Sequence, residues 1–196
     1  MSTLNPEKIF PVLEFINTFL CGLMTGIAVY VVAVEQPSRM TMKDPVAIHR
    51  QWLTSFHRCA RLMMSLSVFP QLSGVAAYYM DAARGLPWLI VAGLLLFNMP
   101  YTLLVLKPYF IDPILDENTC SKKEHAYVVD RVVKWTRAHM VRVLINIAAF
   151  GLSVYTVVYT WLCWIVHELY FIAFYSLVIR EMLFRAKHKL CFTCRI

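Results

Sequence analysis

Charged residues are scarce in this chain, which excludes an ordinary soluble domain. Asp, Glu, Lys and Arg make up 16% of the 196 residues, whereas hydrophobic residues make up 59%. Soluble domains usually carry about a quarter charged and about 45–50% apolar residues. The formal net charge of +7 does not indicate a nucleic-acid partner, because the basic residues are dispersed beside apolar segments. We therefore expect a polytopic helical membrane protein with no nucleic-acid partner.

Several motifs of catalysis and metal binding are also missing. The sequence has no nucleotide-binding loop, no His-Glu-x-x-His helix, no Gly-x-Ser-x-Gly elbow and no Cys-x-x-Cys-His attachment site for haem. Its six Cys show no spacing typical of a disulfide framework. No metal and no cofactor are expected. Two alternatives stay open, a haem held between His57 and His139 and a zinc site at Cys191 and Cys194, although juxtamembrane Cys residues of this kind are more often lipidated or inert.

What the chain does contain is four long apolar runs. Each is close to the roughly 20 residues with which a helix crosses a hydrocarbon core of about 30 Å. The sequence predicts an all-α fold: an integral membrane up-down four-helix bundle over residues 1–164, with an appended C-terminal amphipathic or fifth helix over residues 165–196. Gly22 and Gly26 form a small-xxx-small pair suited to close helix contact. The runs are Val12–Val34, Leu62–Met80, Pro87–Leu106 and Arg142–Trp164.

Local signals predict where the helices begin and end. Pro37 is expected to stop the first span, because the residue before a proline resists the helical conformation. Asp44 followed by Pro45 is typical of a helix start. We expect Asp81–Pro87 to form a short turn and Lys107–Ser121 to form a loop.

The distribution of basic residues predicts the orientation in the membrane. The first connection, Glu35–Arg61, holds five Lys and Arg, and the third, Lys107–Arg137, holds six, whereas the second has only Arg84. The positive-inside rule places the first and third connections in the cytoplasm. The basic C-terminal tail conflicts with this orientation, because with four spans the tail would lie on the non-cytoplasmic side. Either Trp161–Ile179 forms a fifth span, or the fourth helix runs on and the tail lies along the headgroups as an amphipathic helix, which we favour.

Polar and aromatic side chains that could bind a ligand or take part in catalysis lie at one end of each apolar run. In an up-down bundle these four ends are neighbours, so we expect the side chains to meet in one cytoplasm-facing pocket. Charged groups in lipid are costly and usually mark a function. In the fourth helix Trp135, His139, Arg142 and Asn146 are spaced four, three and four, which is one helix face. The other members of the set are Glu35, Arg39, Trp52, His57 and Asn98.

These residue types suit a flat aromatic ligand that enters from the bilayer. An imidazole can take or give a proton near neutral pH, an Arg in a dry site can hold an anion, and the indole rings can stack on a planar ring. Structural interpretations stand beside this one. The Trp side chains can be interfacial anchors, Glu35 and Arg39 can form an ion pair at a helix end, and Arg58, Arg61 and Arg137 can be snorkelling residues or topology markers.

Four segments, in order, carry a resemblance to a known family. They are Glu35-Gln-Pro37-Ser-Arg39, Trp52-Leu-Thr-Ser-Phe56-His-Arg58, Asn98-Met-Pro100-Tyr-Thr102 with Lys107-Pro108, and Trp135-Thr-Arg-Ala-His139-Met-Val-Arg142. Over about Gly22 to Tyr159 the chain resembles the anthrone oxygenase-like family of small four-helix membrane proteins. Members of that family in fungi oxidise an anthrone to an anthraquinone with dioxygen and without a known cofactor.

The resemblance implies roles for the polar residues. His139, or else His57, would remove a proton from a hydroxylated aromatic substrate, and Arg142 with Asn98 would stabilise the anion that reacts with dioxygen. The substrate-binding set would be Glu35, Arg39, Trp52, Asn98, Trp135 and Asn146. The chain has Lys107-Pro108-Tyr109 where the family's oxygenases often show Pro-Thr-Asn, so the resemblance does not fix the substrate.

A non-catalytic function is the alternative. The chain would then be an accessory subunit of a complex or a binder of lipid or quinone, and the aromatic, basic tail would dock a protein partner. In either case the expected ligand is a hydrophobic aromatic small molecule or a lipid. An endomembrane such as that of the endoplasmic reticulum is the default location for this topology.

Overall fold

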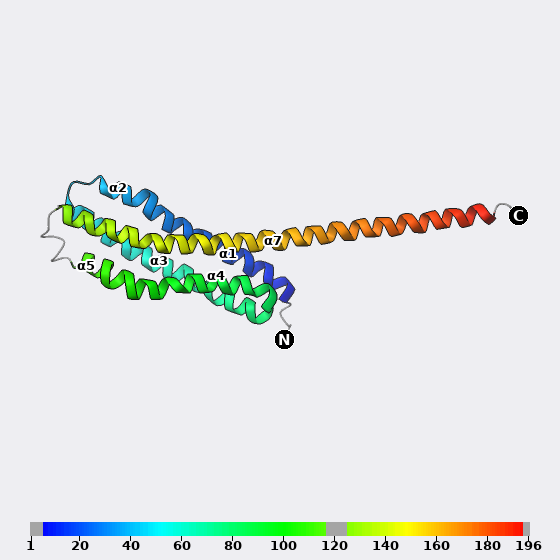
Figure 1. The fold of residues 1–196 in the computed structure, drawn as a ribbon, viewed down its shortest axis with the longest axis horizontal. Coiled ribbons are helices and arrows are strands. Elements are labelled where there is room, and N and C mark those ends of the chain that lie inside the picture. Colours follow the sequence, from blue (N-terminus) through cyan, green and yellow to red (C-terminus); the bar gives the residue numbers. More distant parts are fainter. Residues whose placement is uncertain (1–5, 117–124, 194–196) are drawn as a thin grey trace. The chain divides into compact units, whose positions relative to one another are not determined.

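The computed structural model describes residues 6–116 and 125–193, and every element in this part of the chain is helical (Figure 1). The predicted all-α architecture with four helices is therefore confirmed. The chain falls into two compact units, Met1–Tyr155 and Thr156–Ile196, and the domain boundary expected near residue 164 stays a prediction. Cys120 and Cys194 lie outside the described residues, and so does the side chain of Cys191.

Four long helical segments follow one another along the chain. The first is α1 (Pro6–Tyr30), continued by a π-helical turn η1 (Val31–Glu35) and by α2 (Gln36–Met40). The second is α3 (Pro45–Met80). The third is α4 (Ala82–Tyr101), continued by the π-helical η2 (Thr102–Ile111) and by α5 (Asp112–Leu115). The fourth is α7 (His125–Thr193).

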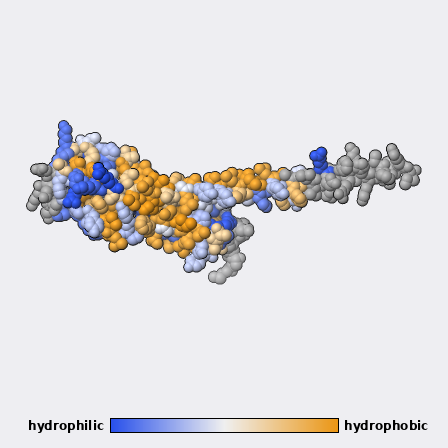
Figure 2. Space-filling model, in the orientation of Figure 1, coloured by the Kyte–Doolittle hydropathy of each residue, from blue (hydrophilic) through white to orange (hydrophobic). Residues whose placement is uncertain are grey.

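Three of these segments are long and apolar enough to cross a membrane. They are Ile9–Met40, Ala82–Leu115 and His125–Ser176. The predicted second span lies in α3, which does not reach the same hydropathy and carries Arg50 and Arg58 in its first half. Apolar side chains cover the middle of the first unit in Figure 2, with hydrophilic residues at the end that carries α2 and α5. A membrane protein is the class that this arrangement defines.

The helix starts agree with the local signals better than the helix ends do. The Asp44 carboxylate accepts hydrogen bonds from the backbone N of Val46 at 3.0 Å and of Ala47 at 3.2 Å, with Pro45 in the first turn of α3, as predicted. The first helix does not stop at Pro37, however, because a proline is tolerated in the first turn of a new helical segment, here α2.

Two predicted connections are shorter than expected. Residues 107–115 are helical in η2 and α5 rather than a loop, and α4 begins at Ala82 directly after Asp81. The Asp81 carboxylate caps α4 through the backbone N of Ala83 and Arg84. α7 contains no turn between His125 and Thr193, so the fourth predicted span and the appended segment belong to one helix, and no hairpin leads into a separate fifth span.

The four segments meet at one end of the first unit, the end with α2 and α5 in Figure 1. A buried apolar cluster there takes side chains from every segment, including Val31, Trp52, Leu106 and Trp135. The imidazole Nε2 of His49 lies 2.6 Å from the carbonyl O of Ile114 and joins α3 to α5. Side chains from all four segments therefore pack together at this end of the first unit.

Close approach between α3 and α4 depends on two glycines. A Cβ on Gly74 would lie 2.4 Å from the backbone O of Trp88, and a Cβ on Gly85 would lie 2.4 Å from the backbone of Ala77 and Tyr78. Backbones this close leave no room for any side chain. The predicted pair contributes less, since Gly22 meets only the Phe150 ring, and a Cβ on Gly26 would meet nothing within 4 Å.

Candidate functional site

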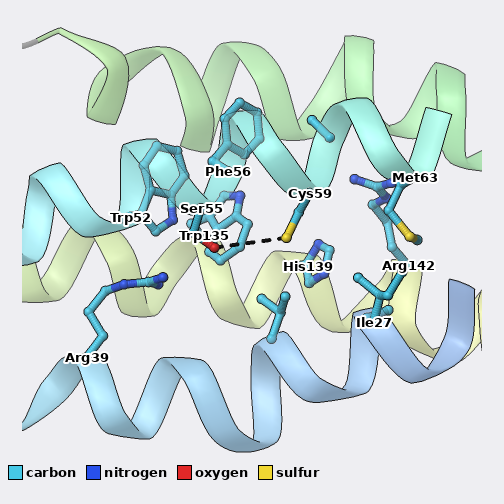
Figure 3. A pocket seen from close by; sticks show the side chains of 13 residues that line it. Ile27, Arg39, Trp52, Ser55, Phe56, Cys59, Met63, Trp135, His139 and Arg142 are labelled. Atoms are coloured by element: carbon cyan, nitrogen blue, oxygen red, sulfur yellow. Dashed lines mark hydrogen bonds between the residues drawn. The ribbon is translucent and has the colours of Figure 1, made fainter. Parts of the chain in front are cut away.

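A cavity lies among the first, second and fourth helical segments at the end where they converge (Figure 3). It holds about 50 Å³ of free space, much less than the roughly 300 Å³ or more of a typical ligand pocket. A multi-ring ligand therefore needs its walls to move apart. Thirteen residues line the cavity: Ile27, Ala28, Val31, Arg39, Trp52, Ser55, Phe56, Cys59, Ala60, Met63, Trp135, His139 and Arg142.

Flat rings form the cavity wall at its wide end. The Trp52 ring stacks on Phe56 with centroids 5.0 Å apart and planes 6° apart. Trp135 meets Trp52 edge-on at 5.3 Å and stacks on His139 at 5.0 Å with an interplanar angle of 14°. Because each ring is held by another, the wall presents rigid aromatic surfaces of the kind that stack on a planar ligand.

The cavity reaches the side of the bundle as well as its interior. Ile27 on α1 and Phe56 and Ala60 on α3 are only half-buried although they line the cavity. Ile27 lies within the first candidate membrane span, Ile9–Met40. The cavity wall is therefore incompletely covered at the outer surfaces of α1 and α3.

Arg39 reaches this cavity through the π turn that precedes it. Buried residues of the first helix are three apart from Ala28 to Val31, then five apart to Gln36, and three apart again to Arg39. A π turn takes one more residue than an α turn, so η1 accounts for the longer interval. As a result Gln36 and Arg39 turn inward while Glu35 stays at the rim.

The Arg39 guanidinium is 1% exposed and only partly neutralised. Its Nη2 donates to Glu35 Oε1 at 2.5 Å, and its Nη1 donates to Gln36 Oε1 at 2.6 Å. Its Nε has no protein acceptor. The predicted ion pair of Glu35 and Arg39 is therefore present, and the Nε–H of Arg39 has no acceptor in the protein.

His139 and Arg142 lie on consecutive turns of α7 and both line the cavity. His139 is 8% exposed, and its Nδ1 has no hydrogen-bond partner. Arg142 is half-buried, and its Nε is also unpaired. Among the ion pairs of the described residues none involves Arg142. This leaves a cation next to an imidazole in an apolar surrounding, an arrangement that attracts an anion.

Two predicted binding residues pair with each other and do not line the cavity. Asn98 Nδ2 donates to Asn146 Oδ1 at 2.9 Å, and Thr25 Oγ1 donates to the carbonyl O of Asn146 at 3.0 Å. The two bonds link α4 and α1 to α7. Asn98 Oδ1 and Asn146 Nδ2 remain without partners, so the pair keeps one acceptor and one donor inside the bundle.

The remaining predicted residues divide between the cavity and the surface. Trp52 and Trp135 line the cavity, and the Nε1 of Trp52 has no acceptor there. His57 is exposed and is not among the lining residues. Its ring touches the edge of Phe56, with centroids 5.6 Å apart. Of the two histidines proposed as bases, the structure brings only His139 to the cavity.

Cys59 and Ser55 line the cavity although neither was assigned to the site from sequence. Their Sγ and Oγ atoms are 4.0 Å apart, at the limit of a sulfur hydrogen bond (Figure 3). The signal was present in the spacing, because Trp52, Phe56, Cys59 and Met63 share one face of α3. No group of three His, Cys, Asp or Glu that could hold a metal ion occurs among the described residues.

Apolar helices that enclose a small cavity, walled by rings and lined with unpaired N–H donors, define a membrane protein with an internal cavity. Comparison with known proteins gives the family. Residues 52–152 match the family model described as anthrone oxygenase, which is more than half of the chain, and the protein belongs to that family. No curated protein and no solved structure matches it.

The matched segment runs from Trp52 to Leu152 and includes the cavity residues of α3 and α7. Ile27, Ala28, Val31 and Arg39 complete the cavity from outside that segment. The side of the cavity formed by the first helix is therefore not described by the family match.

Proposed function

We propose that this protein is a cofactor-independent oxygenase that acts on a hydrophobic, hydroxylated aromatic substrate of the anthrone kind. Membership of the anthrone oxygenase family supports the reaction class. The ring-walled cavity supports a planar aromatic substrate. The proposed net reaction converts one ring CH₂ and one O₂ into a ketone and one water.

In the proposed mechanism His139 acts as the base. Its unpaired Nδ1 takes an acidic C–H proton from the substrate. Removal of that proton puts negative charge on the ring carbon and the conjugated carbonyl oxygen, and the guanidinium of Arg142 stabilises this charge. Trp52 and Trp135 hold the ring plane while the carbanion adds dioxygen. The peroxide anion takes the proton back from His139, and the hydroperoxide then loses the second C–H proton, breaks its O–O bond and releases water to leave the ketone. Asn98 and Asn146 support this geometry from one turn deeper in the bundle, through the bond that joins α4 to α7.

One observation carries the proposal: Arg142 is a half-buried cation at the cavity with no carboxylate partner among the described residues. A cation in such a place is costly unless it meets an anion. A substrate that becomes an anion during the reaction provides that partner when it is needed, so the interaction favours the transition state over the ground state.

The test is oxygen consumption by the purified protein in mild detergent with a hydroxylated anthrone, together with the absorbance of the quinone product. His139→Gln is expected to reduce turnover by about 10²-fold or more, which is the usual contribution of a general base. His57→Gln is the matched variant, and it is expected to retain turnover because His57 lies outside the cavity. Loss of turnover in His57→Gln alone would transfer the role of base to His57.

Binding without catalysis is the second candidate, and the small size of the cavity favours it. A cavity of this size holds the head of a quinone or lipid more readily than a whole tricyclic ring system. Mass spectrometry of small molecules extracted from the purified protein separates the two functions. A bound quinone or lipid together with no oxygen consumption would support the binder and overturn the oxygenase.

Location and partners belong to the same proposal. We propose that the protein resides in an endomembrane such as that of the endoplasmic reticulum. The appended part of α7 exposes large apolar side chains, including Trp161, Trp164 and Tyr170, which suit lipid or a protein partner. Co-purification with one subunit at fixed stoichiometry would favour an accessory role.

A further inference from the structure

A cysteine outside the proposed reaction lies in the same cavity. Cys59 is half-buried on α3, and its Sγ has Ser55 Oγ as a contact at 4.0 Å. Two other free cysteines have different surroundings. Cys21 is 1% exposed and packed in an apolar cluster, and Cys163 is exposed on α7. The chain therefore contains a thiol at the cavity, a thiol in an apolar core and a thiol on the surface, whose reactivities can be compared.

The groups around Cys59 independently indicate a ligand. His139 and Arg39 line the same cavity, are 8% and 1% exposed, and keep Nδ1 and Nε without partners. Figure 3 shows the Cys59 side chain pointing from α3 into the space that His139 and Arg142 enter from α7. An imidazole with an unpaired ring nitrogen that shares a cavity with a Cys side chain is the pairing in which the thiol acts as a nucleophile.

We propose that Cys59 is a covalent capture site for small, planar α,β-unsaturated carbonyl compounds, such as quinones with a free ring position. His139 takes the proton from the thiol, and Cys59 Sγ forms a bond to the β-carbon. The π electrons of the C=C bond move onto the carbonyl oxygen, where Arg142 stabilises the enolate. The proton then returns from His139 to the α-carbon. The sum is one thiol plus one alkene giving one thioether, with no oxidant or reductant consumed.

This capture shares His139 and Arg142 with the proposed oxygenation, but it needs no dioxygen and no oxygenation product, so its test is separate from the test of oxygenase activity. The cavity would then be occupied covalently by a planar electrophile that is small enough to enter it. A quinone that adds to Cys59 would fill the roughly 50 Å³ of free space and exclude other ligands.

The test uses full-length protein in mild detergent and N-ethylmaleimide, a small planar activated alkene. Two variants each keep one cysteine, Cys59 or Cys163, with the other five changed to Ser. Intact mass and peptide mapping then give the rate of labelling. Cys59 is expected to react about tenfold faster or more than Cys163, even though Cys163 is more exposed, because base assistance is typically worth about 10²-fold or more.

A second comparison identifies the base. In the chain that keeps only Cys59, His139→Gln is expected to slow labelling by about tenfold, and His125→Gln, on the exposed first turn of α7, is expected to leave it unchanged. Equal labelling of Cys59 and Cys163 would overturn the proposal, and so would an unchanged rate in a folded His139→Gln variant. If His139→Gln does not fold, the comparison of the two cysteines decides alone.

Discussion

The side chains at the cavity show how far single residues can be interpreted without coordinates. Trp135, His139 and Arg142 were predicted to share one face of α7, and all three line the cavity. Helical spacing was sufficient for this, because the face of a helix follows from residue number alone. Asn98 and Asn146 were expected to meet a ligand, yet they bond to each other. Spacing does not reveal which side chain on another helix is near enough to be a partner.

The unpaired cation at the cavity leads to a prediction on catalysis. Arg142→Gln should lower kcat by about 10²–10³-fold with the aromatic substrate, the usual loss when one donor to a developing anion is removed. Arg142→Lys should retain part of the activity because it keeps the charge. Arg137→Gln is the control, since Arg137 is exposed on the same helix. If Arg142→Gln and Arg137→Gln have equal kcat, Arg142 is not at the reacting centre.

Two ion pairs with the same spacing provide a stability test. Glu35 and Arg39 are four residues apart with side chains 14% and 1% exposed, whereas Asp130 and Lys134, also four apart, are 52% and 54% exposed. Glu35→Gln should lower the free energy of unfolding by about 3 kcal/mol, because it leaves a buried cation without its carboxylate. Asp130→Asn should change it by less than about 1 kcal/mol. Thermal unfolding followed by tryptophan fluorescence measures both, and similar losses would show that Arg39 is hydrated.

At the scale of helices, starts were predicted correctly and interruptions were not. Asp44 and Pro45 begin α3 as expected, because a cap acts within one turn of the chain. The π-helical η1 and η2 were missed. A π turn is set by packing between helices rather than by local residue preference, so an apolar run such as Val31–Glu35 carries no sign of it. The loop expected after Lys107 is helical for the same reason.

Contact between α3 and α4 gives the prediction at this scale. Gly74→Ala should destabilise the protein by about 1–3 kcal/mol, because the new Cβ would lie 2.4 Å from the backbone O of Trp88 and the helices must separate. Gly93→Ala is the matched control in α4, since its Cβ would meet nothing within 4 Å, and it should be neutral or slightly stabilising. Equal melting temperatures for the two variants would contradict the close approach.

At the scale of the whole molecule, composition predicted the class and the number of helices. Apolar runs of membrane length were visible in the sequence, and three of the four helical segments meet the length and hydropathy of a span. α3 does not, because its most apolar part, Leu62–Met80, contains polar residues such as Ser65, Ser67 and Gln71, and Arg50, Arg58 and Arg61 precede that part. None of these three arginines lines the cavity, and the α3 residues that do are mostly apolar.

Orientation is the prediction that belongs to the whole chain. In a protein without other cysteines, Lys43→Cys marks the first connection and Arg84→Cys marks the second. The positive-inside rule predicts that an impermeant maleimide labels Lys43→Cys in intact microsomes and reaches Arg84→Cys only after detergent is added. The opposite pattern would place the cavity end on the lumenal side.

The incompletely covered wall formed by Ile27, Phe56 and Ala60 has a consequence for any measurement of affinity. If a guest molecule enters the cavity laterally from the acyl chains, its occupancy depends on its mole fraction in the lipid phase and not on its molarity in the buffer. Far below saturation, doubling the detergent at a fixed amount of guest would then halve the occupancy. Binding data collected at different detergent concentrations would fall onto one curve only when occupancy is plotted against the ratio of guest to detergent.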